Sequence, residues 1–252
     1  KVQKLKFINM KKVVLIIQAR VGSTRLPGKS LLDLAGKPLV GRIIERVKKC
    51  NNINQIILAI PNSKENDPLM EIGKENNIST FRGSELNLLE RYYKAAKFSS
   101  ADYIVRLPAD NATPEPCEID KIIDHHKSLN RVGFSSNLSS FFGSNYPDGI
   151  GAEIFDFNLL EEAYIKENDK QKLEHVHLNF FDYFKEQAVD SNWCPISTIK
   201  CPEEYSRPDI VLDINTFDQY VFIKELYEYL YVKNPNFTIM DIIYWYDNVY
   251  KK

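Results

Sequence analysis

Runs of branched apolar residues alternate with amphipathic stretches along this chain of 252 residues. The first run, residues 13–17, is continuously apolar, which is typical of a strand covered on both faces of a parallel sheet. Further strand-like runs lie at residues 56–60, 78–81 and 103–107. Helical spacing follows residue 39 and recurs at about residues 67–76 and 85–98. The alternation predicts stacked βαβ units and an α/β fold.

The pattern is less regular after residue 130. We expect helices near residues 157–167, 174–187, 215–231 and 238–249, and strands at 194–199 and 210–212. The segment 135–149, rich in Ser, Asn, Phe and Gly, is predicted to be a substrate loop or lid. Residues 1–9 precede an internal methionine, Met10, and we interpret residues 1–10 as a leader or extension. Residues 11–252 are expected to form one domain, with halves at about 11–130 and 131–252.

Composition narrows the class of protein. The formal net charge of −1 gives no electrostatic footprint for nucleic acid, so we expect no nucleic-acid partner. No apolar run is long enough to span a bilayer, so we expect no membrane partner and a cytoplasmic location. The four cysteines form no Cys-x-x-Cys pair, which argues against zinc and against a disulfide framework.

A cationic, glycine-containing loop follows the first strand directly. Arg20 and Arg25 offer planar forks for phosphate oxygens, and Lys29 adds a compact charge. Gly22 and Gly28 allow close backbone approach and positive φ. Because open α/β sheets bind ligands at the carboxyl ends of their strands, this loop predicts a site for a polyphosphate.

Two familiar phosphate loops do not fit this stretch. A Walker A loop has four residues between its glycines, whereas Gly22 and Gly28 enclose five, one of which is Pro27. The dinucleotide fingerprint fails as well, because no third glycine lies at the required offset. The sequence therefore argues against a P-loop NTPase and against a nicotinamide dehydrogenase.

The chain resembles the cytidylyltransferases that activate acidic sugars, the acylneuraminate and CMP-Kdo synthetases, and most of all the spore-coat polysaccharide biosynthesis protein F group. The motifs that carry the resemblance occur in the family's order: residues 17–29 (IQARVGSTRLPGK), 81–84 (FRGS), 106–110 (RLPAD), 146–149 (YPDG), 174–176 (EHV) and 212–213 (LD). The first motif is specific, and the order of the others strengthens it. The resemblance implies a GT-A or Rossmann-like three-layer sandwich with a mostly parallel sheet and a smaller irregular subregion for acceptor binding and dimerisation.

The resemblance also implies an activity and a set of residues. The activity is transfer of CMP from CTP to a sugar acid or related small acidic acceptor, with release of pyrophosphate, for surface polysaccharide biosynthesis. Arg20, Arg25 and Lys29 would act on the triphosphate, and Asp110 and Asp213 would bind Mg²⁺, which favours a few carboxylates with phosphates and waters. The remaining nucleotide-binding positions would be Gln18, Ala19, Gly22, Ser23, Arg82, Gly83, Ser84 and Arg106.

Several of these residues have other interpretations. Asp213 comes shortly before a predicted helix and could cap it, and Asp110 lies in a sequence that suits a turn. Arg82 could pair with Glu85 or Glu90 on the surface. The histidines other than His175, including His177, are expected to be ordinary surface or helix residues.

The acceptor side is less defined by the sequence. Its expected residues are Tyr146, Asp148, Glu153, His175 and Arg207. A turn at residues 146–149 would place Tyr146 and Asp148 in an exposed array, and Arg207 could fork onto an acidic substrate. A hydroxyl acceptor would need a proton acceptor such as His175 or Asp148, whereas a phosphate or phosphonate acceptor would need none.

Two positions depart from the family pattern beside the acceptor residues. Ala112 stands where a proline is expected, and Gly151 stands where an acidic residue is expected. These changes leave open a nucleotidyltransferase acting on a sugar phosphate, a phosphonate or another phosphorylated acceptor. A separate alternative is a non-catalytic nucleotide-binding relative, against which the pair Asp110 and Asp213 argues. The resemblance implies a homodimer, and the aromatic segments 180–181 and 227–231 could contribute to its contact or to the core.

Overall fold

The computed structural model describes residues 11–138 and 143–251. Residues 1–10, interpreted above as a leader, and residues 139–142 of the expected lid lie outside the described residues. A seven-stranded sheet organises the fold, in the order β11–β7–β8–β6–β1–β4–β5. Its strands are β1 Val13–Gln18, β4 Gln55–Pro61, β5 Ser79–Gly83, β6 Tyr103–Pro108, β7 Phe134–Ser136, β8 Glu153–Asp156 and β11 Ile196–Ser197.

The sheet is mostly parallel, as the apolar pattern predicts. Strands β5, β4, β1 and β6 pair in parallel, whereas β8 runs antiparallel between β6 and β7. Strand β1 lies between β6 and β4, and each residue from Val13 to Ile17 is fully buried. Both faces of β1 are therefore covered, which explains its unbroken apolar run.

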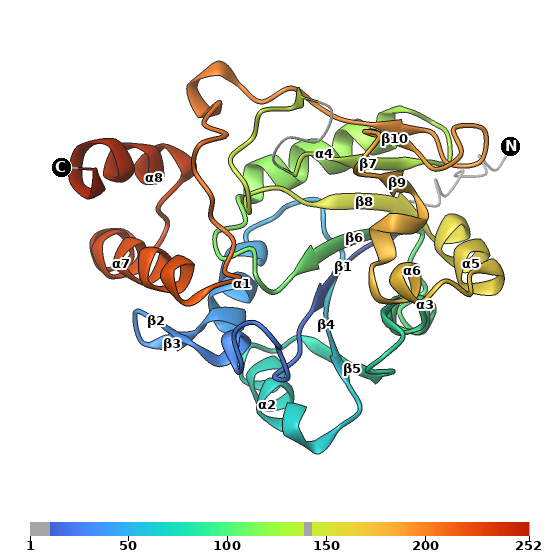
Figure 1. The fold of residues 1–252 in the computed structure, drawn as a ribbon, viewed down its shortest axis with the longest axis horizontal. Coiled ribbons are helices and arrows are strands. Elements are labelled where there is room, and N and C mark those ends of the chain that lie inside the picture. The colour runs from blue at the N-terminus through green and yellow to red at the C-terminus, as the bar shows by residue number, and fades with distance from the viewer. Residues whose placement is uncertain (1–10, 139–142, 252) are drawn as a thin grey trace, which may run out of the picture.

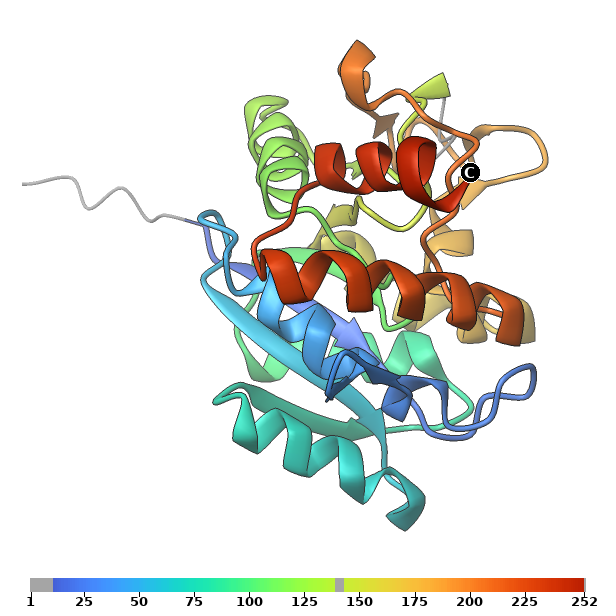
Figure 2. The same cartoon turned by 90° about the vertical axis from the view of Figure 1, so that its left-hand side faces the viewer.

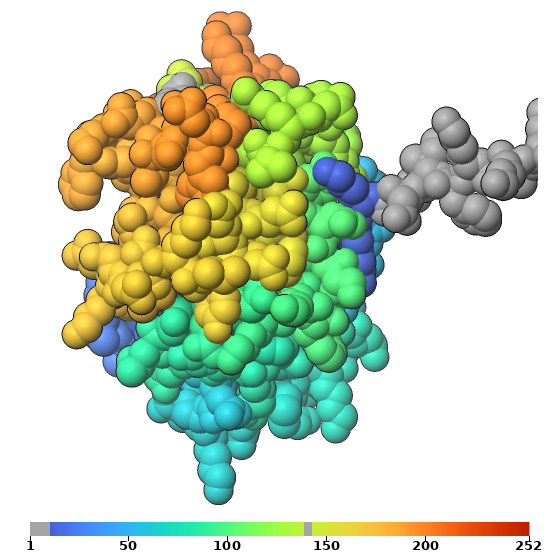
Figure 3. All heavy atoms as spheres, turned by 90° about the vertical axis from the view of Figure 1, so that its right-hand side faces the viewer, coloured from blue at the N-terminus to red at the C-terminus, as the bar shows by residue number. Residues whose placement is uncertain are grey.

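Helices form the two outer layers of this α/β sandwich (Figure 1). They are α1 Leu39–Val47, α2 Asp67–Glu75, α3 Leu88–Phe98, α4 Pro116–Ser128, α5 Phe157–Lys166, α6 Lys170–Glu174, α7 Phe217–Lys233 and α8 Ile239–Trp245. Figure 2 shows α7 and α8, in red, in front of the sheet. On the opposite side, α5 in yellow packs beside α3 in green (Figure 3).

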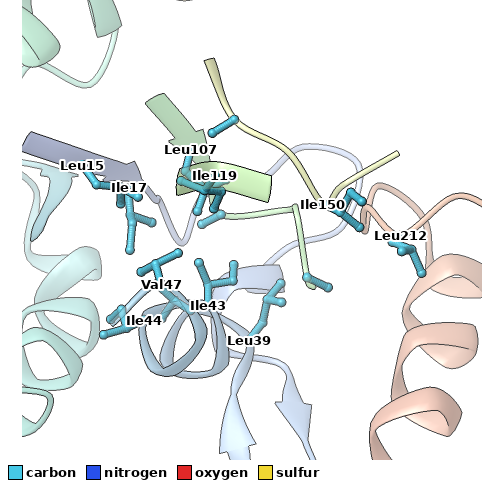
Figure 4. Close-up of a cluster of buried hydrophobic side chains, with 14 of the residues drawn as sticks. Leu15, Ile17, Leu39, Ile43, Ile44, Val47, Leu107, Ile119, Ile150 and Leu212 are labelled. Carbon is cyan, nitrogen blue, oxygen red and sulfur yellow. The ribbon is translucent and has the colours of Figure 1, made fainter. Parts of the chain in front are cut away.

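Alternate residues of β1 supply two separate apolar cores. Leu15 and Ile17 face α1, whose Ile43 and Val47 point toward them (Figure 4). Val14 and Ile16 belong to the other core, with α3 and α5. Because successive strand residues point to opposite faces, one short strand anchors both helical layers.

The second half of the chain differs most from the expectation at residues 174–187. The helix predicted over residues 174–187 is wrong: α6 ends at Glu174, and a 3₁₀ turn, Val176–Asn179, leads into the hairpin β9 Phe181–Asp182 and β10 Gln187–Ala188. The side chain of Asp182 accepts the backbone N–H groups of Phe184 and Lys185, which favours a turn over a helix.

Other boundaries are shorter than predicted. Helix α3 begins at Leu88 rather than near residue 85, because the side chain of Asn87 caps it by accepting the Glu90 N–H at 2.8 Å. The strand expected at 194–199 is reduced to β11, and at 210–212 there is only an isolated bridge between Val211 and Asp148. The helices predicted near 157–167 and 215–231 correspond to α5 and α7.

The aromatic residues considered for a dimer contact lie mainly in the core. Phe180 and Phe181 are at most 1% exposed, and Tyr227 donates a hydrogen bond from its hydroxyl to the carbonyl of Ala112 at 2.7 Å. Of the two alternatives open for these segments, packing in the core therefore holds for these three residues, and the homodimer stays a prediction. Among the described residues, no helix is long and apolar enough to cross a membrane.

Candidate active site

A cavity of about 350 Å³ opens at the carboxyl ends of β1 and β6. The chain leads from β1 to β4 and β5 on one side of the sheet and from β6 to β7 and β8 on the other, so this is the point where the strand order reverses. Open α/β sheets bind ligands at such switch points. The cavity is lined by Gln18, Ala19, Arg20, Ser23, Thr24, Arg25, Lys29, Ser30, Glu85, Leu88, Arg91, Arg106, Pro108, Ala109, Asp110, Glu174, His175, His177 and Asn215.

The loop after β1 is folded back by its own backbone. The N–H groups of Ser23 and Gly28 donate to the carbonyl of Val21 at 2.8 and 3.0 Å. Gly28 has a φ of 72°, as expected, whereas the positive φ expected for Gly22 is wrong. Gly22 instead allows close approach, because a Cβ there would meet Glu65 Oε1 at 3.2 Å. The fold-back brings Arg20, Arg25 and Lys29 to the same cavity.

Lys29 joins this loop to the segment after β6 and to the segment before α7. Its Nζ donates to Asp110 Oδ2 at 3.0 Å and to the carbonyl of Ile214 at 2.9 Å. Its side chain is 15% exposed, and that of Asp110 is 25% exposed. The ammonium group is therefore held between the segments after β6 and before α7.

Asp110 and Asp213 lie side by side although about a hundred residues separate them. The Ile214 N–H donates to the carbonyl of Asp110 at 2.9 Å, and Asn111 and Asp213 form a β-bridge. The alternative in which Asp213 caps a helix is wrong, because Thr216 caps α7 and its side chain accepts the Gln219 N–H. Asp110 takes part in the ion pair with Lys29.

Carboxylates crowd around Asp213. Burial and the nearby charges of Asp148 and Asp110 raise its pKa to about 6, against a smaller opposing effect of Lys29. Among residues 11–138 and 143–251, no group of three or more His, Cys, Asp or Glu side chains is placed to hold a metal ion. A divalent cation here would therefore have two aspartates at most with phosphates and waters, which is how Mg²⁺ is commonly bound. The repulsion at Asp213 is what such a cation relieves.

Only some of the residues expected near the base line the cavity. Gln18, Ala19, Ser23 and Arg106 line the cavity, whereas Arg82 does not. Arg82 donates to Asp67 Oδ1 and to the carbonyl of Ser63, both at 2.7 Å, so its pairing with Glu85 or Glu90 is wrong.

Gly83 and Ser84 shape the approach to α3. The Ser84 hydroxyl accepts the Asn87 N–H at 3.0 Å, just before the helix starts. A Cβ on Gly83 would meet Arg91 Cγ at 2.9 Å, so the missing side chain leaves room for Arg91.

Arg106 is buried beneath the cavity. It donates from Nη1 to Glu153 Oε2 at 2.6 Å, and Tyr183 donates from its hydroxyl to Glu153 Oε1 at 3.1 Å. Glu153, expected to contact the acceptor, is fully buried and holds this pair instead of lining the cavity.

Two further acceptor residues lie elsewhere. Tyr146 is fully buried and donates to Glu118 Oε2 at 2.7 Å, so the expectation of an exposed array is wrong. Arg207 pairs with Asp209 and Asp247 at 2.8 and 2.6 Å, outside the cavity lining. His175 does line the cavity, and Asp148 lies beside Asp213 without lining it.

The departure at Gly151 has a steric cause. A Cβ at this position would meet the carbonyl oxygen of Asn137 at 2.3 Å, and Asn137 Oδ1 at 2.6 Å. Backbone atoms cannot retreat as a flexible side chain can, so an acidic side chain has no room here.

Replacing Gly151 with aspartate is therefore expected to lower the free energy of unfolding by about 2–3 kcal/mol. Urea denaturation measures the change. Gly41→Ala is the matched control, since a Cβ in that helix meets nothing nearer than 3.9 Å and alanine favours helix. Equal stability of Gly151→Asp and Gly41→Ala would contradict the steric explanation.

Several cavity residues were missed by sequence reasoning. Arg91 lies three residues after Leu88, on the buried stripe of α3, and a cation on an apolar stripe is the signal that could have revealed it. His177, expected to be ordinary, lines the cavity. Burial first and then the charge of Arg106 hold its pKa well below the usual range, so it is neutral in the folded protein.

Acid is expected to destabilise the protein through His177. The unfolded chain takes up a proton near pH 6.5, but the folded chain resists it, so the free energy of unfolding falls as the pH drops below about 6.5. Urea denaturation of wild type and His177→Gln at pH 7.5 and 5.5 measures this. The wild type should lose more stability than the variant over that interval, and parallel losses would show that His177 is not involved.

Known proteins are similar to this chain in sequence and in fold. The family described as Cytidylyltransferase matches residues 14–236. The spore coat polysaccharide biosynthesis protein SpsF of Bacillus subtilis is 30% identical over 87% of this chain and 88% of that protein. A cytidylyltransferase structure from Leptospira borgpetersenii is 29% identical, with a TM-score of 0.80 over 92% of both chains. A structure of CMP:2-keto-3-deoxy-manno-octonic acid synthetase complexed with CTP shares the fold, with a TM-score of 0.64, 15% identity and coverage of 86% of this chain and 98% of that one.

Proposed function

Because the chain belongs to the cytidylyltransferase family, we propose that it transfers CMP from CTP to a small acidic acceptor and releases pyrophosphate. The observation that carries this proposal is the convergence at one cavity of three loop cations with Asp110, beside which Asp213 lies although it does not itself line the cavity. We further propose that the product serves surface polysaccharide biosynthesis, which the similarity to SpsF supports.

The cations of the loop would bind the triphosphate. Arg20 and Arg25 supply forked donors at the cavity wall, and Lys29 lies deepest, beside Asp110. Fixed positive charge around the reacting phosphate stabilises charge that develops in the transition state. An acceptor oxygen would attack the innermost phosphorus, and the bond to pyrophosphate would break on the opposite side.

Mg²⁺ fits the carboxylates that the structure brings together. Asp110 and Asp213 would hold it, and when bound it would neutralise phosphate charge and favour departure of pyrophosphate. The pKa of Asp213 is raised because nearby negative charges outweigh the positive charge of Lys29. This excess of negative charge supports a cation site beside Asp213.

The acceptor would approach from the side of α6 and the turn after it. His175 and His177 line this side, and Arg106 lies beneath it. Of the two groups considered for removing a proton from a hydroxyl, His175 lines the cavity and Asp148 does not, so we assign this step to His175.

Pyrophosphate release tests the proposal. Purified protein with MgCl₂ is offered CTP, UTP, ATP, GTP or dTTP, each with a panel of sugar acids, sugar phosphates and phosphonates. We expect release with CTP and an acidic acceptor. Turnover with another nucleotide but none with CTP would refute the cytidylyl transfer. Magnesium-dependent CTP binding with no turnover on any acceptor would favour a non-catalytic relative.

A further inference from the structure

The cavity contains buried polar atoms that the protein itself leaves without partners. Arg91 is 4% exposed, and its Nε and Nη1 have no hydrogen-bond partner. Gln18 Oε1 is also buried without a partner, and both residues line the same cavity. Buried polar groups are almost always hydrogen-bonded, so such a pair at a cavity points to a ligand that completes it.

Arg91 is held in place by its packing. Its stem lies against Gly83, where a Cβ would come within 2.9 Å of Cγ. The next residue, Tyr92, is fully buried and donates from its hydroxyl to the carbonyl of Ile16 at 3.2 Å, which ties α3 to β1. The guanidinium is therefore presented from a rigid helix next to the end of β1.

The surroundings of Arg91 do not neutralise it. Burial lowers its pKa to about 10, and the charge of Arg20 acts in the same direction, while Glu85 opposes them. Since Arg91 stays cationic near neutral pH, its buried N–H groups require acceptor atoms from the ligand.

The ligand must also carry a donor, because Gln18 Oε1 is an acceptor. A fully ionised phosphate has acceptors only and cannot satisfy it. The edge of cytosine has an amino donor, N4–H₂, beside the acceptors N3 and O2. Uracil carries an N–H at position 3, which would oppose an arginine N–H, and an acceptor at position 4. The donor and acceptor set therefore matches cytosine and does not match uracil.

We propose that Arg91 and Gln18 recognise the base edge of the bound nucleotide and select cytosine over uracil. This inference rests on the proposed function, because it assumes a nucleotide in the cavity. It adds the residues that set base specificity, one of which lies outside every motif identified in the sequence.

Calorimetric titration with CTP, UTP and inorganic tripolyphosphate, each with MgCl₂, tests the inference without an acceptor. For Arg91→Lys, which keeps the charge but loses the fork, we expect CTP affinity to fall about tenfold or more. UTP and tripolyphosphate affinities should change little. Arg131→Lys, at an exposed position, is the matched control and should behave as wild type.

Gln18→Glu provides a second measurement if Arg91→Lys does not fold. A carboxylate accepts from the cytosine amino group and repels O4 of uracil, so the preference for CTP over UTP should be kept or increased. A reversed preference would overturn the inference. Equal losses of CTP, UTP and tripolyphosphate binding in Arg91→Lys would also overturn it and show that Arg91 binds phosphate.

The two proposals can fail separately. If wild type binds none of the nucleotides, the proposed function itself is wrong. If wild type prefers CTP and Arg91→Lys keeps the same preference, only the base-recognition inference is wrong.

Discussion

Replacing Asp110 with asparagine is expected to reduce kcat for pyrophosphate release by about 10³-fold or more, because the proposed Mg²⁺ loses a charged ligand next to the reacting phosphate. Asparagine has nearly the same shape, so the fold should persist. The carboxylate is 25% exposed and faces the cavity, and its backbone carbonyl, which accepts the Ile214 N–H, is unchanged by the substitution.

Initial rates over a range of CTP and MgCl₂ concentrations measure this effect. Asp124→Asn is the matched control, since Asp124 is exposed on α4 outside the cavity lining. Asp110→Asn should also require more MgCl₂ for half-maximal rate. A variant with normal kcat and an unchanged magnesium requirement would remove Asp110 from the proposed mechanism.

Lys29→Gln is expected to lower kcat/KM for CTP by about 10²–10³-fold. This is the range seen when one positioned hydrogen-bond donor to a developing charge is removed. Lys29 is 15% exposed and bridges Asp110 and the carbonyl of Ile214, so its charge is fixed beside Asp110. Glutamine can still donate to one of these oxygens, which favours folding but removes the positive charge.

The control for Lys29 is Lys200→Gln, an exposed lysine in the irregular part of the chain. It removes the same charge from the protein and should leave kcat/KM unchanged. If both variants lose activity equally, the effect of Lys29 is one of net charge, and its position beside Asp110 is irrelevant. Thermal unfolding of the variants shows whether the fold is kept.

Sequence reasoning succeeded where one short segment contains all the information. The apolar run 13–17 predicts a doubly covered strand, and the cations that follow it must lie near its end. It failed where a distant partner decides the outcome. Tyr146 was expected to be exposed, but Glu118 from another element accepts its hydroxyl. Arg207 was expected to meet an acceptor, but Asp247 occupies its guanidinium.

The same distinction applies to the cavity. The pair Asp110 and Asp213 came from a resemblance, and only the hydrogen bond between the segments that contain them shows how residues so far apart meet. Arg91 was missed because its lack of a partner is a property of the folded interior, and no local pattern records it. The helix expected at 174–187 failed because turn formation by Asp182 outweighs helical spacing.

The bond from the Ile214 amide to the Asp110 carbonyl has a practical consequence. Whenever the segment before α7 detaches, this amide exchanges its hydrogen with solvent, and at the same moment Asp213 leaves its neighbour. Deuterium uptake at one backbone position therefore gauges the fraction of molecules whose two carboxylates are together. In the proposed mechanism, that fraction would set an upper limit on specific activity at any temperature, well before the whole chain melts.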